Sequence, residues 1–463
     1  MIKIGNRVEQ LQIAYIGGGS RGWAWGLMSD LALSPELSGT VKLYDIDREA
    51  AKRNEIIGNR LTSLPESKGD WHYEAVNTLE EALRGSDFVI ISIVPGSFDE
   101  MASDVHTPEK YGIYQSVGDT VGPGGILRAL RVIPMYVEIA EALKGFCPDA
   151  WIINYTNPMT LCTRILYEVF PEVKAFGCCH EVFEVQKLLA DMLADLTGIT
   201  GVHRDEIKTN VLGINHFTWI DRAEYDGKNL LPLYKEFAEK YFKEGFTKQK
   251  KDHWMNQYFD SAHRVKFDLF RRYGIIAAAG DRHLAEFCGK SYLASPEDIA
   301  YWKFSLTPVS WRKENRTRLL EQSEKMVNGD EPLKLEGSGE EGVLQIKALL
   351  GLGDLITNVN VPNIGQMSGF PLGSVVETNA VLSQNRITPV ASGRLPAEVE
   401  SLVLRHVTNQ ETTLQAALHK DANIAFRAFS ADPLVSIGVM DASSLMQEML
   451  QNTRGYLPGW NLD

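Results

Sequence analysis

Short apolar runs alternate with longer amphipathic stretches along the first two hundred residues. The apolar runs are rich in Val, Ile and aromatic residues and lie at Leu11–Ile16, Val41–Tyr44, Phe88–Val94, Trp151–Ile153 and Val173–Phe176. Runs of this kind are typical of strands covered by helices on both faces. Between them, apolar residues recur at helical spacing over Trp23–Leu33, Arg48–Leu61, Leu127–Leu143 and Met159–Phe170. The alternation predicts an α/β protein with a doubly wound parallel sheet.

The pattern changes after about residue 200. A strand is expected at Ile207–Ala223, followed by helices at Leu231–Gly245, Asp252–Tyr273 and Gly342–Leu350 and by strands at Ile356–Val361 and Ser374–Thr378. At 463 residues, the chain exceeds what one hydrophobic core usually serves. We therefore place a boundary near Gly198–Gly201, between a first domain (1–200) and an α+β second domain (201–463).

Composition narrows the class of protein. The formal net charge of -13 argues against nucleic acid or an anionic membrane as a partner, because both attract clustered cations. No apolar run reaches the roughly 20 residues of a transmembrane helix, and Met1–Gln10 is not followed by the apolar core of a secretory signal. Five scattered cysteines are typical of reduced thiols rather than a disulfide framework. The expectation is a soluble cytoplasmic protein.

A glycine-rich turn follows the first strand. Gly17, Gly19 and Gly22 form a G-x-G-x-x-G pattern that permits a tight turn, close approach of a pyrophosphate and close helix–strand packing. Asp45 ends the second strand, where a carboxylate would accept from a ribose hydroxyl and favour NAD over NADP. The apolar run alone leaves Asp47 as the alternative. The pattern predicts a Rossmann-type NAD-binding domain with the layout of lactate and malate dehydrogenases.

A cysteine–histidine cluster follows the last strand of this domain. Cys178, Cys179 and His180 come where the strand passes to a helix, at the carboxyl edge of the sheet where ligands bind. His216 follows the end of a later apolar strand. A thiolate and an imidazole would suit a divalent transition metal with open positions. Spacing alone also allows a core cysteine and an ordinary polar histidine, and it leaves open which thiol points inward.

Three other polar stretches are candidates for function. They are Asn154–Met159, which ends a strand, Gly118–Gly125, which precedes a helix carrying Arg128 and Arg131, and Gly280–Glu286, which combines acid, base and cation. Each stretch is also compatible with a capped loop or a surface ion pair.

Together these motifs resemble the NAD- and metal-dependent enzymes of glycoside hydrolase family four. The resemblance spans nearly the whole chain and rests on Ile13–Gly22, Gly118–Arg131, Asn154–Met159, Cys179–Val182 and Gly213–Phe217. The four residues that begin at the metal-binding cysteine differ between substrate subgroups of the family. Cys-His-Glu-Val, at 179–182, is similar to the subgroup that acts on α-galacturonides.

The resemblance implies roles for individual residues. Cys179 and His216 would bind a catalytic divalent metal, typically Mn²⁺, and Asn157 would contact the substrate. Gly17, Gly19 and Ser20 would surround the NAD pyrophosphate. The family's general base is a Tyr in some branches and an Asp in others, so Asp281 is our choice and Tyr273 the alternative.

The resemblance also implies the chemistry. NAD⁺ would oxidise C3 of the sugar, a base would remove the C2 proton with help from the metal, and an acid, for which His180 is the adjacent candidate, would assist departure of the glycosidic oxygen. Water addition and return of the hydride would follow, so that NAD is not consumed. The substrate's carboxylate calls for a bidentate guanidinium, and the candidates are Arg264, Arg282 and Arg128.

Other functions remain open at this point. Within the family, an α-glucuronidase or an α-galactosidase is the alternative. A 2-hydroxy-acid dehydrogenase would share the layout but would need no metal, and a non-catalytic NAD-sensing protein would bind without turnover. We also expect a homodimer or homotetramer, assembled through the second domain.

Overall fold

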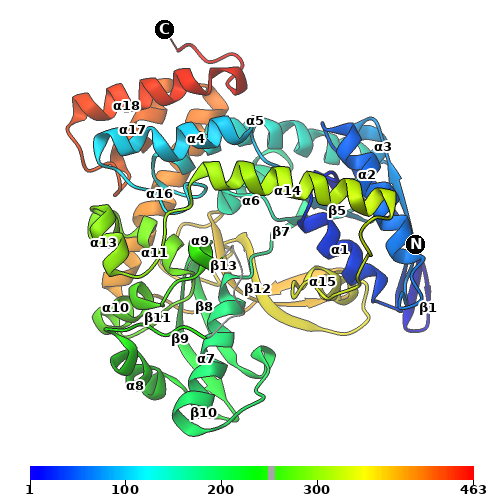
Figure 1. Ribbon diagram of the computed structural model, residues 1–463, viewed down its shortest axis with the longest axis horizontal. Coiled ribbons are helices and arrows are strands. Elements are labelled where there is room, and N and C mark those ends of the chain that lie inside the picture. Colours follow the sequence, from blue (N-terminus) through cyan, green and yellow to red (C-terminus); the bar gives the residue numbers. More distant parts are fainter. Residues whose placement is uncertain (249–255, 463) are drawn as a thin grey trace.

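The computed structural model describes residues 1–248 and 256–462, and its centre is a parallel sheet (Figure 1). The parallel strands are β2 (Arg7–Ile16), β3 (Leu37–Tyr44), β4 (Asp70–Ala75), β5 (Phe88–Ile91), β6 (Trp151–Asn154) and β7 (Lys174–Gly177), with β1 (Ile2–Ile4) antiparallel to β2. Their order is β7-β6-β5-β2-β3-β4. The chain runs outward in both directions from the β2/β5 pair, so this pair is the switch point at which α/β sheets bind ligands. The predicted Rossmann-type doubly wound sheet is confirmed.

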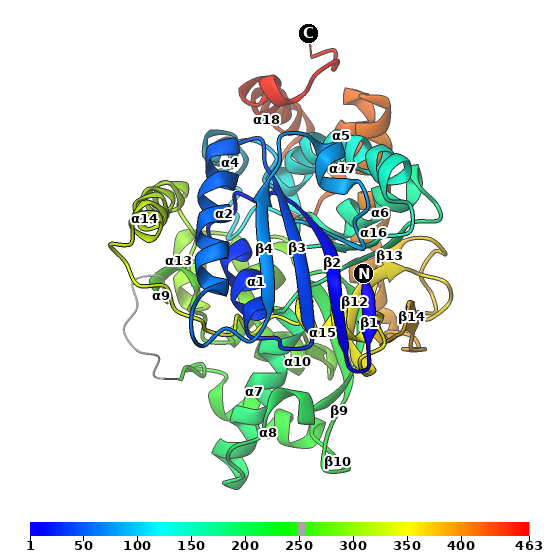
Figure 2. The same cartoon turned by 90° about the vertical axis from the view of Figure 1, so that its right-hand side faces the viewer.

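Helices cover both faces of this sheet. They are α1 (Trp23–Ala32), α2 (Arg48–Thr62), α3 (Leu79–Leu83), α4 (Phe98–His106), α5 (Gly122–Phe146), α6 (Met159–Val169) and α7 (Glu181–Thr197). Figure 2 shows α1 and α2 on one side of the strands and α5 and α6 on the other. Alternate residues of β2 enter different hydrophobic clusters, Ile13 and Tyr15 with α1 and Ala14 and Ile16 with α5. Two buried faces explain why the strand is apolar throughout.

The sequence pattern missed β4. Trp71 and Tyr73 of this edge strand are buried, whereas Asp70, His72 and Glu74 are exposed. A strand with one wet face alternates apolar and polar residues, and over six residues this alternation is a weak signal.

The second half of the chain completes the same sheet. The strands β12 (Leu355–Pro362), β13 (Val375–Ser383) and β14 (Arg386–Pro389) extend it antiparallel beyond β7. The helices α16 (Ala397–His419), α17 (Ala422–Ala431) and α18 (Val439–Asn452) pack against α5. Hydrophobic clusters therefore span both halves. The boundary at 198–201 stays a prediction, and α7 ends just before it.

A second, smaller sheet packs beside α7. It contains β8 (Lys208–Ile214), β9 (Phe217–Tyr225), β10 (Lys228–Asn229) and β11 (Ile276–Ala277). The expected single strand over Ile207–Ala223 is wrong, because β8 and β9 form an antiparallel hairpin that turns at Asn215 and His216. His216 has a φ of +63°, so a non-glycine residue makes the turn, and the apolar residues that continue on both sides hid it.

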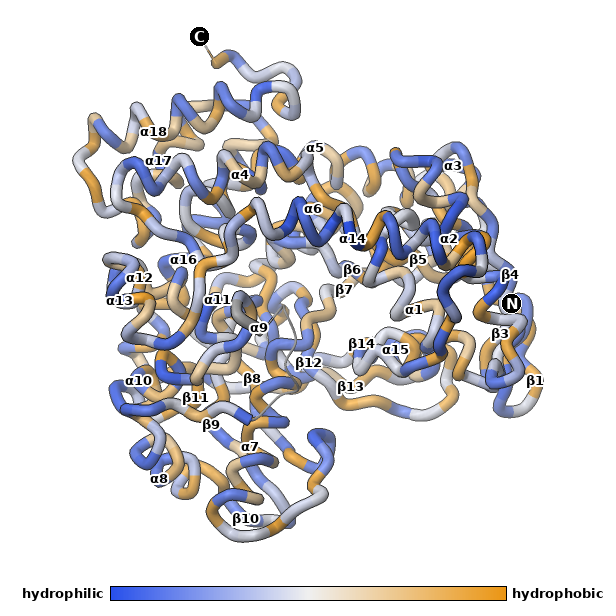
Figure 3. Tube along the Cα trace, viewed as in Figure 1, coloured by the Kyte–Doolittle hydropathy of each residue, from blue (hydrophilic) through white to orange (hydrophobic). Residues whose placement is uncertain are grey.

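Helices surround the small sheet and return to the large one. They are α8 (Leu231–Tyr241), α9 (Asn256–Phe259), α10 (Arg264–Tyr273), α11 (Asp281–Phe287), α12 (Lys290–Leu293), α13 (Pro296–Tyr301), α14 (Val309–Asn328) and α15 (Gly342–Leu349). The helix expected over 252–273 begins only at Arg264, although part of that range lies outside the described residues. The mostly hydrophilic α14 packs on α2 and α4 (Figure 3). No described helix combines the length and the hydropathy needed to cross a bilayer.

Candidate functional site

The glycine-rich turn lies at the switch point of the sheet. Gly17 has a φ of +89°, and a Cβ on it would lie 1.9 Å from the carbonyl oxygen of Ser92, after β5. Gly22 precedes α1, no side chain caps that helix, and a Cβ on Gly22 would meet open space. Uncapped amides at a helix start favour an anion. The predicted residues Gly17, Gly19, Ser20 and Gly22 thus form a turn that fits a pyrophosphate.

The structure separates the roles of the two candidate aspartates. Asp45 accepts from the backbone N–H of Gly19 at 2.9 Å, whereas Asp47 caps α2 through the N–H of Ala50. Asp45 is therefore the carboxylate beside the glycine turn, and its predicted contact with a ribose stays a prediction. Sequence reasoning missed Asn54, whose amide donates to the carbonyls of Gly18 and Ser20 and holds the turn on α2.

A cavity of about 290 Å³ opens at the carboxyl edge of the parallel sheet. Residues from five predicted stretches line it, among them Asp119, Asn157, Cys179, His216 and Asp281. Three polar atoms of its lining are buried without a hydrogen-bond partner in the described residues: Oδ1 of Asn157, Nδ1 of His283 and Nε of Arg282. Buried polar atoms are nearly always paired, so these atoms are fitted to a ligand rather than to the fold.

One group in this cavity has the geometry of a metal site. Side-chain ligand atoms of Asp119, His216 and His283 all lie within 4.8 Å of one another. The two imidazoles stack with centroids 3.7 Å apart, and Nδ1 of His216 lies 2.9 Å from the hydroxyl of Thr120. Burial, followed by the neighbouring imidazole charge, lowers the pKa of His216 to about 3. Its imidazole is thus neutral, which is the form that binds a metal.

Cys178 and Cys179 both line the cavity, and they differ in what their thiols contact. The buried side chain of Cys179 lies beside Asn215 and the carboxylates of Glu377 and Glu181, and burial followed by these charges raises its pKa well above the ordinary value. A bound cation would reverse that preference, because a metal-bound thiol is deprotonated. The thiol of Cys178 instead accepts a hydrogen bond from Gln345 and packs among the apolar residues under β12. The residues present therefore fit a divalent metal.

Asn157 connects the metal-type group to α5. Its side-chain amide nitrogen donates to Asp119 at 3.2 Å, and its main-chain carbonyl accepts from Nε of Arg128. Burial acts to raise the pKa of Asp119, but the electrostatic interactions with the neighbouring groups of His283, His216 and Arg128 outweigh it and hold that pKa well below its usual range. An ionised carboxylate is therefore present before any ligand binds.

His180 stands at the edge of this cavity. Its Nδ1 lies 3.0 Å from Oε1 of Glu340, and the ring faces Trp23 with centroids 6.0 Å apart. The hydrogen bond to Glu340 is the largest cause that raises the pKa of His180, ahead of the opposing effect of burial. A half-exposed imidazole with a raised pKa at the cavity wall is compatible with the predicted role of a proton donor, which stays a prediction.

The two predicted base residues lie in different places. Asp281 lines the cavity, and its carboxylate oxygens accept from the backbone N–H groups of Val265 and Lys266, at the start of α10. Its side chain is buried with 0% exposure. Tyr273 packs against Trp219 and is not among the residues that line the cavities of the described structure. The role of either residue as the base stays a prediction, and the hydrogen bonds to a helix N-terminus give the Asp281 carboxylate a structural alternative.

The predicted carboxylate-binding arginines are also mostly occupied. Arg264 donates to the carbonyls of Phe242 and Tyr301 and lies over the rings of Tyr301 and Trp302, away from the cavity. Arg128 donates to the main-chain carbonyl of Asn157 and is not among the residues that line the cavity. Main-chain carbonyls take up donors of Arg264 and Arg128, and neither residue is among those that line this cavity, so their role toward a carboxylate stays a prediction. Arg282 does line the cavity.

Sequence reasoning missed four lining residues: Asp119, Glu181, His283 and Arg312. Asp119 and His283 belong to polar stretches that the pattern had marked, so the signal was present but not resolved to a residue. Glu181 accepts from the N–H of Gly280 and lies 3.5 Å from His283. Arg312 comes from an otherwise ordinary hydrophilic helix, and nothing in the local sequence distinguishes it.

Comparison with known proteins places this geometry in a family. The model of family 4 glycosyl hydrolases matches residues 12–195, and the model of the C-terminal domain of that family matches residues 211–435. The chain belongs to family 4 of the glycosyl hydrolases. The resemblance drawn from the motifs is thereby confirmed, and so is the assignment as a glycosidase.

Individual relatives cover nearly the whole chain. An α-galacturonidase from Thermoanaerobacterium saccharolyticum is 64% identical over 98% of this chain and 98% of its own length. The crystal structure of a putative glucosidase, lplD, from Bacillus subtilis has a TM-score of 0.92 at 53% identity, covering 96% of this chain and all of its own. A 6-phospho-α-glucosidase from gut microorganisms, solved with NAD and Mn²⁺, shares the fold with a TM-score of 0.82 at 19% identity, over 98% of this chain and all of its own.

Proposed function

We propose that this glycosidase hydrolyses α-galacturonides. The observation that carries the proposal is the cavity at the carboxyl edge, where Cys179, His216 and the unpaired oxygen of Asn157 converge beside a dinucleotide-type turn. Its volume of about 290 Å³ has room for a single sugar ring. The 64% identity to an α-galacturonidase, and the Cys-His-Glu-Val segment at 179–182, support a uronide as the sugar.

The proposal includes NAD and a divalent cation such as Mn²⁺ as cofactors. Gly17, Gly19, Ser20 and Asp45 would hold the dinucleotide, and Cys179 and His216 the cation, with Asp119 and His283 beside it. When bound, NAD would supply a hydride acceptor for C3 of the sugar, and the cation would polarise the sugar oxygens.

The chain's own residues would bind and orient the sugar. The unpaired Oδ1 of Asn157 would accept from a sugar hydroxyl, since its amide nitrogen is already held by Asp119. His180, held by Glu340 through Nδ1, would donate its proton from Nε2 to the departing glycosidic oxygen. The indole of Trp23 beside that imidazole would limit access of water to the bond.

The remaining assignments belong to the same proposal. We propose a cytoplasmic enzyme, which all five free cysteines support, because a reducing compartment keeps thiols unpaired. We also propose a homodimer or homotetramer, and sedimentation at two protein concentrations tests that assembly. An α-glucuronide, which differs only at C4, and an α-galactoside, which lacks the carboxylate, are the alternative substrates.

Hydrolysis of an aryl α-galacturonide tests the function. Purified protein is assayed with NAD⁺, Mn²⁺ and a thiol reductant each omitted in turn, and aryl α-glucuronide and α-galactoside are run in parallel. We expect hydrolysis of the galacturonide that needs all three components, without net formation of NADH.

Other outcomes would reject parts of the proposal. Hydrolysis of only the glucuronide or only the galactoside would replace the proposed substrate by that sugar and leave the family assignment unchanged. If NADH accumulates with a 2-hydroxy acid and EDTA is harmless, the dehydrogenase alternative replaces the glycosidase. NAD binding without any turnover would favour the non-catalytic sensor.

A further inference from the structure

Two guanidinium groups line the cavity, and they differ in what they contact. Arg282 follows the start of α11, and Arg312 lies in the first turns of α14. Both are near enough to Asp119 for its charge to raise their pKa values against the larger effect of burial. A sugar carboxylate would be paired by whichever guanidinium still has donors free.

One nitrogen of Arg282 is committed to the fold, whereas its buried Nε has no partner among the described residues. Its Nη2 donates to the carbonyl of Ser116 at 2.6 Å and to the hydroxyl of Thr307. The guanidinium carbon lies 4.9 Å from the centre of the Phe259 ring. Ser116 in turn donates to the carbonyl of Arg282. This arginine fastens the loop that carries Asp119 to α11.

Neighbouring residues fix the position of the Arg312 backbone, whereas its guanidinium is not fixed by a hydrogen bond. Its neighbours on α14 are anchored: Val309 is buried against α4 and donates its N–H to His106, and the buried ring of Trp311 packs on Phe259 at 5.1 Å. The guanidinium of Arg312 makes no hydrogen bond or ion pair with any other residue in the described parts of the chain. A desolvated cation without a partner is costly, so a site that keeps one is prepared for an anion.

We propose that Arg312 pairs with the carboxylate of the uronide and thereby sets the preference for galacturonides over neutral galactosides. The proposal rests on the proposed function and names the residue that binds the negatively charged group of the substrate. A neutral galactoside would leave this guanidinium desolvated and unpaired, and sites built to bond a polar group strongly reject analogues that lack it.

The position of Arg312 favours the sugar over the dinucleotide as its anion. The cavity that it lines also contains Asn157, Cys179 and His216, whereas none of the residues from Gly17 to Gly22 lines that cavity. Phosphates of a dinucleotide at the glycine turn would therefore lie outside it.

Three variants test the proposal in the full-length protein with NAD⁺ and Mn²⁺. Arg312→Gln removes the cation, Arg312→Lys keeps the charge but loses the bidentate fork, and Arg318→Gln is the matched control, an exposed arginine farther along the same helix. The measurements are kcat and KM for aryl α-galacturonide and α-galactoside, KM for NAD⁺, and the rise in Tm produced by free D-galacturonate or D-galactose.

We expect Arg312→Gln to lower kcat/KM for the galacturonide by about 30-fold to several thousand-fold, the range for truncating one partner of a buried charge pair. The galactoside and KM for NAD⁺ should change little, and the galacturonate-dependent rise in Tm should disappear. Arg312→Lys should restore part of the loss, and Arg318→Gln should match the wild type.

Two results would overturn the proposal. One is an unchanged preference for galacturonide in both Arg312 variants. The other is an equal loss on both substrates accompanied by a higher KM for NAD⁺, which would assign Arg312 to the cofactor. If the wild type hydrolyses no galacturonide, the proposed function fails instead. The rise in Tm produced by galacturonate then still shows whether Arg312 binds a carboxylate. If the wild type shows no such rise, the proposal for Arg312 is rejected as well.

Discussion

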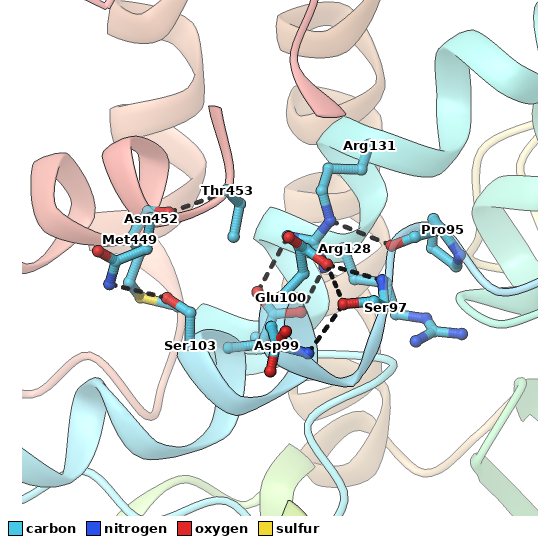
Figure 4. Close-up of polar contacts among 12 residues, drawn as sticks. Pro95, Ser97, Asp99, Glu100, Ser103, Arg128, Arg131, Met449, Asn452 and Thr453 are labelled. Atoms are coloured by element: carbon cyan, nitrogen blue, oxygen red, sulfur yellow. Dashed lines mark hydrogen bonds and ion pairs between the residues drawn. The ribbon is translucent and has the colours of Figure 1, made fainter. Parts of the chain in front are cut away.

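Two buried polar regions of this molecule differ in whether their polar groups have hydrogen-bond partners. Between α4 and α5, Arg131 donates to both carboxylate oxygens of Asp104 and to the carbonyl of Pro95, and both side chains are 1% exposed. Figure 4 shows Arg131 and the carbonyl of Pro95 that accepts from it, beside the Ser97–Glu100 capping box. In the cavity, Arg282, Asn157 and His283 each keep a buried polar atom without a partner among the described residues. Satisfied charges mark the structural region, and unsatisfied ones mark the site.

The comparison predicts that changes in the cavity affect activity while changes between α4 and α5 affect stability. The largest effect should come from Cys179→Ser. Loss of a thiolate ligand should lower kcat/KM by about 1,000-fold or more, because a Lewis acid contributes several kcal/mol to the transition state. Activity titrated with Mn²⁺ measures this, with Cys178→Ser as the control. Equal losses in the two variants would remove the distinction between the thiols.

A change between α4 and α5, Arg131→Met, should affect stability rather than activity. Leaving Asp104 buried without its partner should lower the free energy of unfolding by about 3–5 kcal/mol. Denaturant unfolding measures the loss, and KM for substrate in the remaining folded protein should stay near the wild-type value. The double variant Arg131→Met/Asp104→Leu should recover much of the stability. An altered KM without a loss of stability would place this pair in the site.

A smaller effect is expected at the phosphate-binding turn. Gly17→Ala should cost about 1–3 kcal/mol of stability, because the new Cβ meets the carbonyl of Ser92 in a left-handed conformation. The affinity for NAD⁺, measured by the quench of tryptophan fluorescence, should fall as well. Gly145→Ala, with nothing within 4 Å of the new Cβ, is the control. Undiminished NAD⁺ affinity in Gly17→Ala would place the dinucleotide elsewhere.

The smallest effect on activity should follow Asp281→Asn. The amide oxygen of an asparagine accepts from only one of the two N–H groups at the start of α10, and its NH2 group would face the other, so the loss of stability should be about 1–3 kcal/mol. A carboxylate that serves only this helix would leave kcat within about tenfold of the wild type. Thermal unfolding and steady-state kinetics measure both. A drop in kcat of three orders of magnitude in the folded protein would assign Asp281 as the base.

Some features of the site could be read from residue types alone. The glycine turn, Asp45, Cys179 and Asn157 follow parallel strands, whose carboxyl ends meet at one edge of the sheet, whereas His216 follows β8 of the smaller sheet. The cysteine–histidine pair was recognisable because few residue types bind a transition metal. By contrast, Asp281 and His283 are neighbours in one segment, and only their directions distinguish a helix cap from a member of the metal-type group.

By itself, the sequence determined the parallel α/β sheet, the dinucleotide-type turn and the family. Periodicity and glycine placement are local properties that survive without knowledge of the fold. The tertiary structure decided that β12 to β14 complete the first sheet, that β8 and β9 turn at His216, and that Arg312 reaches the cavity while Arg264 and Arg128 do not. Those outcomes depend on which surfaces pack together and on which carbonyls take up a guanidinium's donors, and neither is set by the residues next to it in sequence.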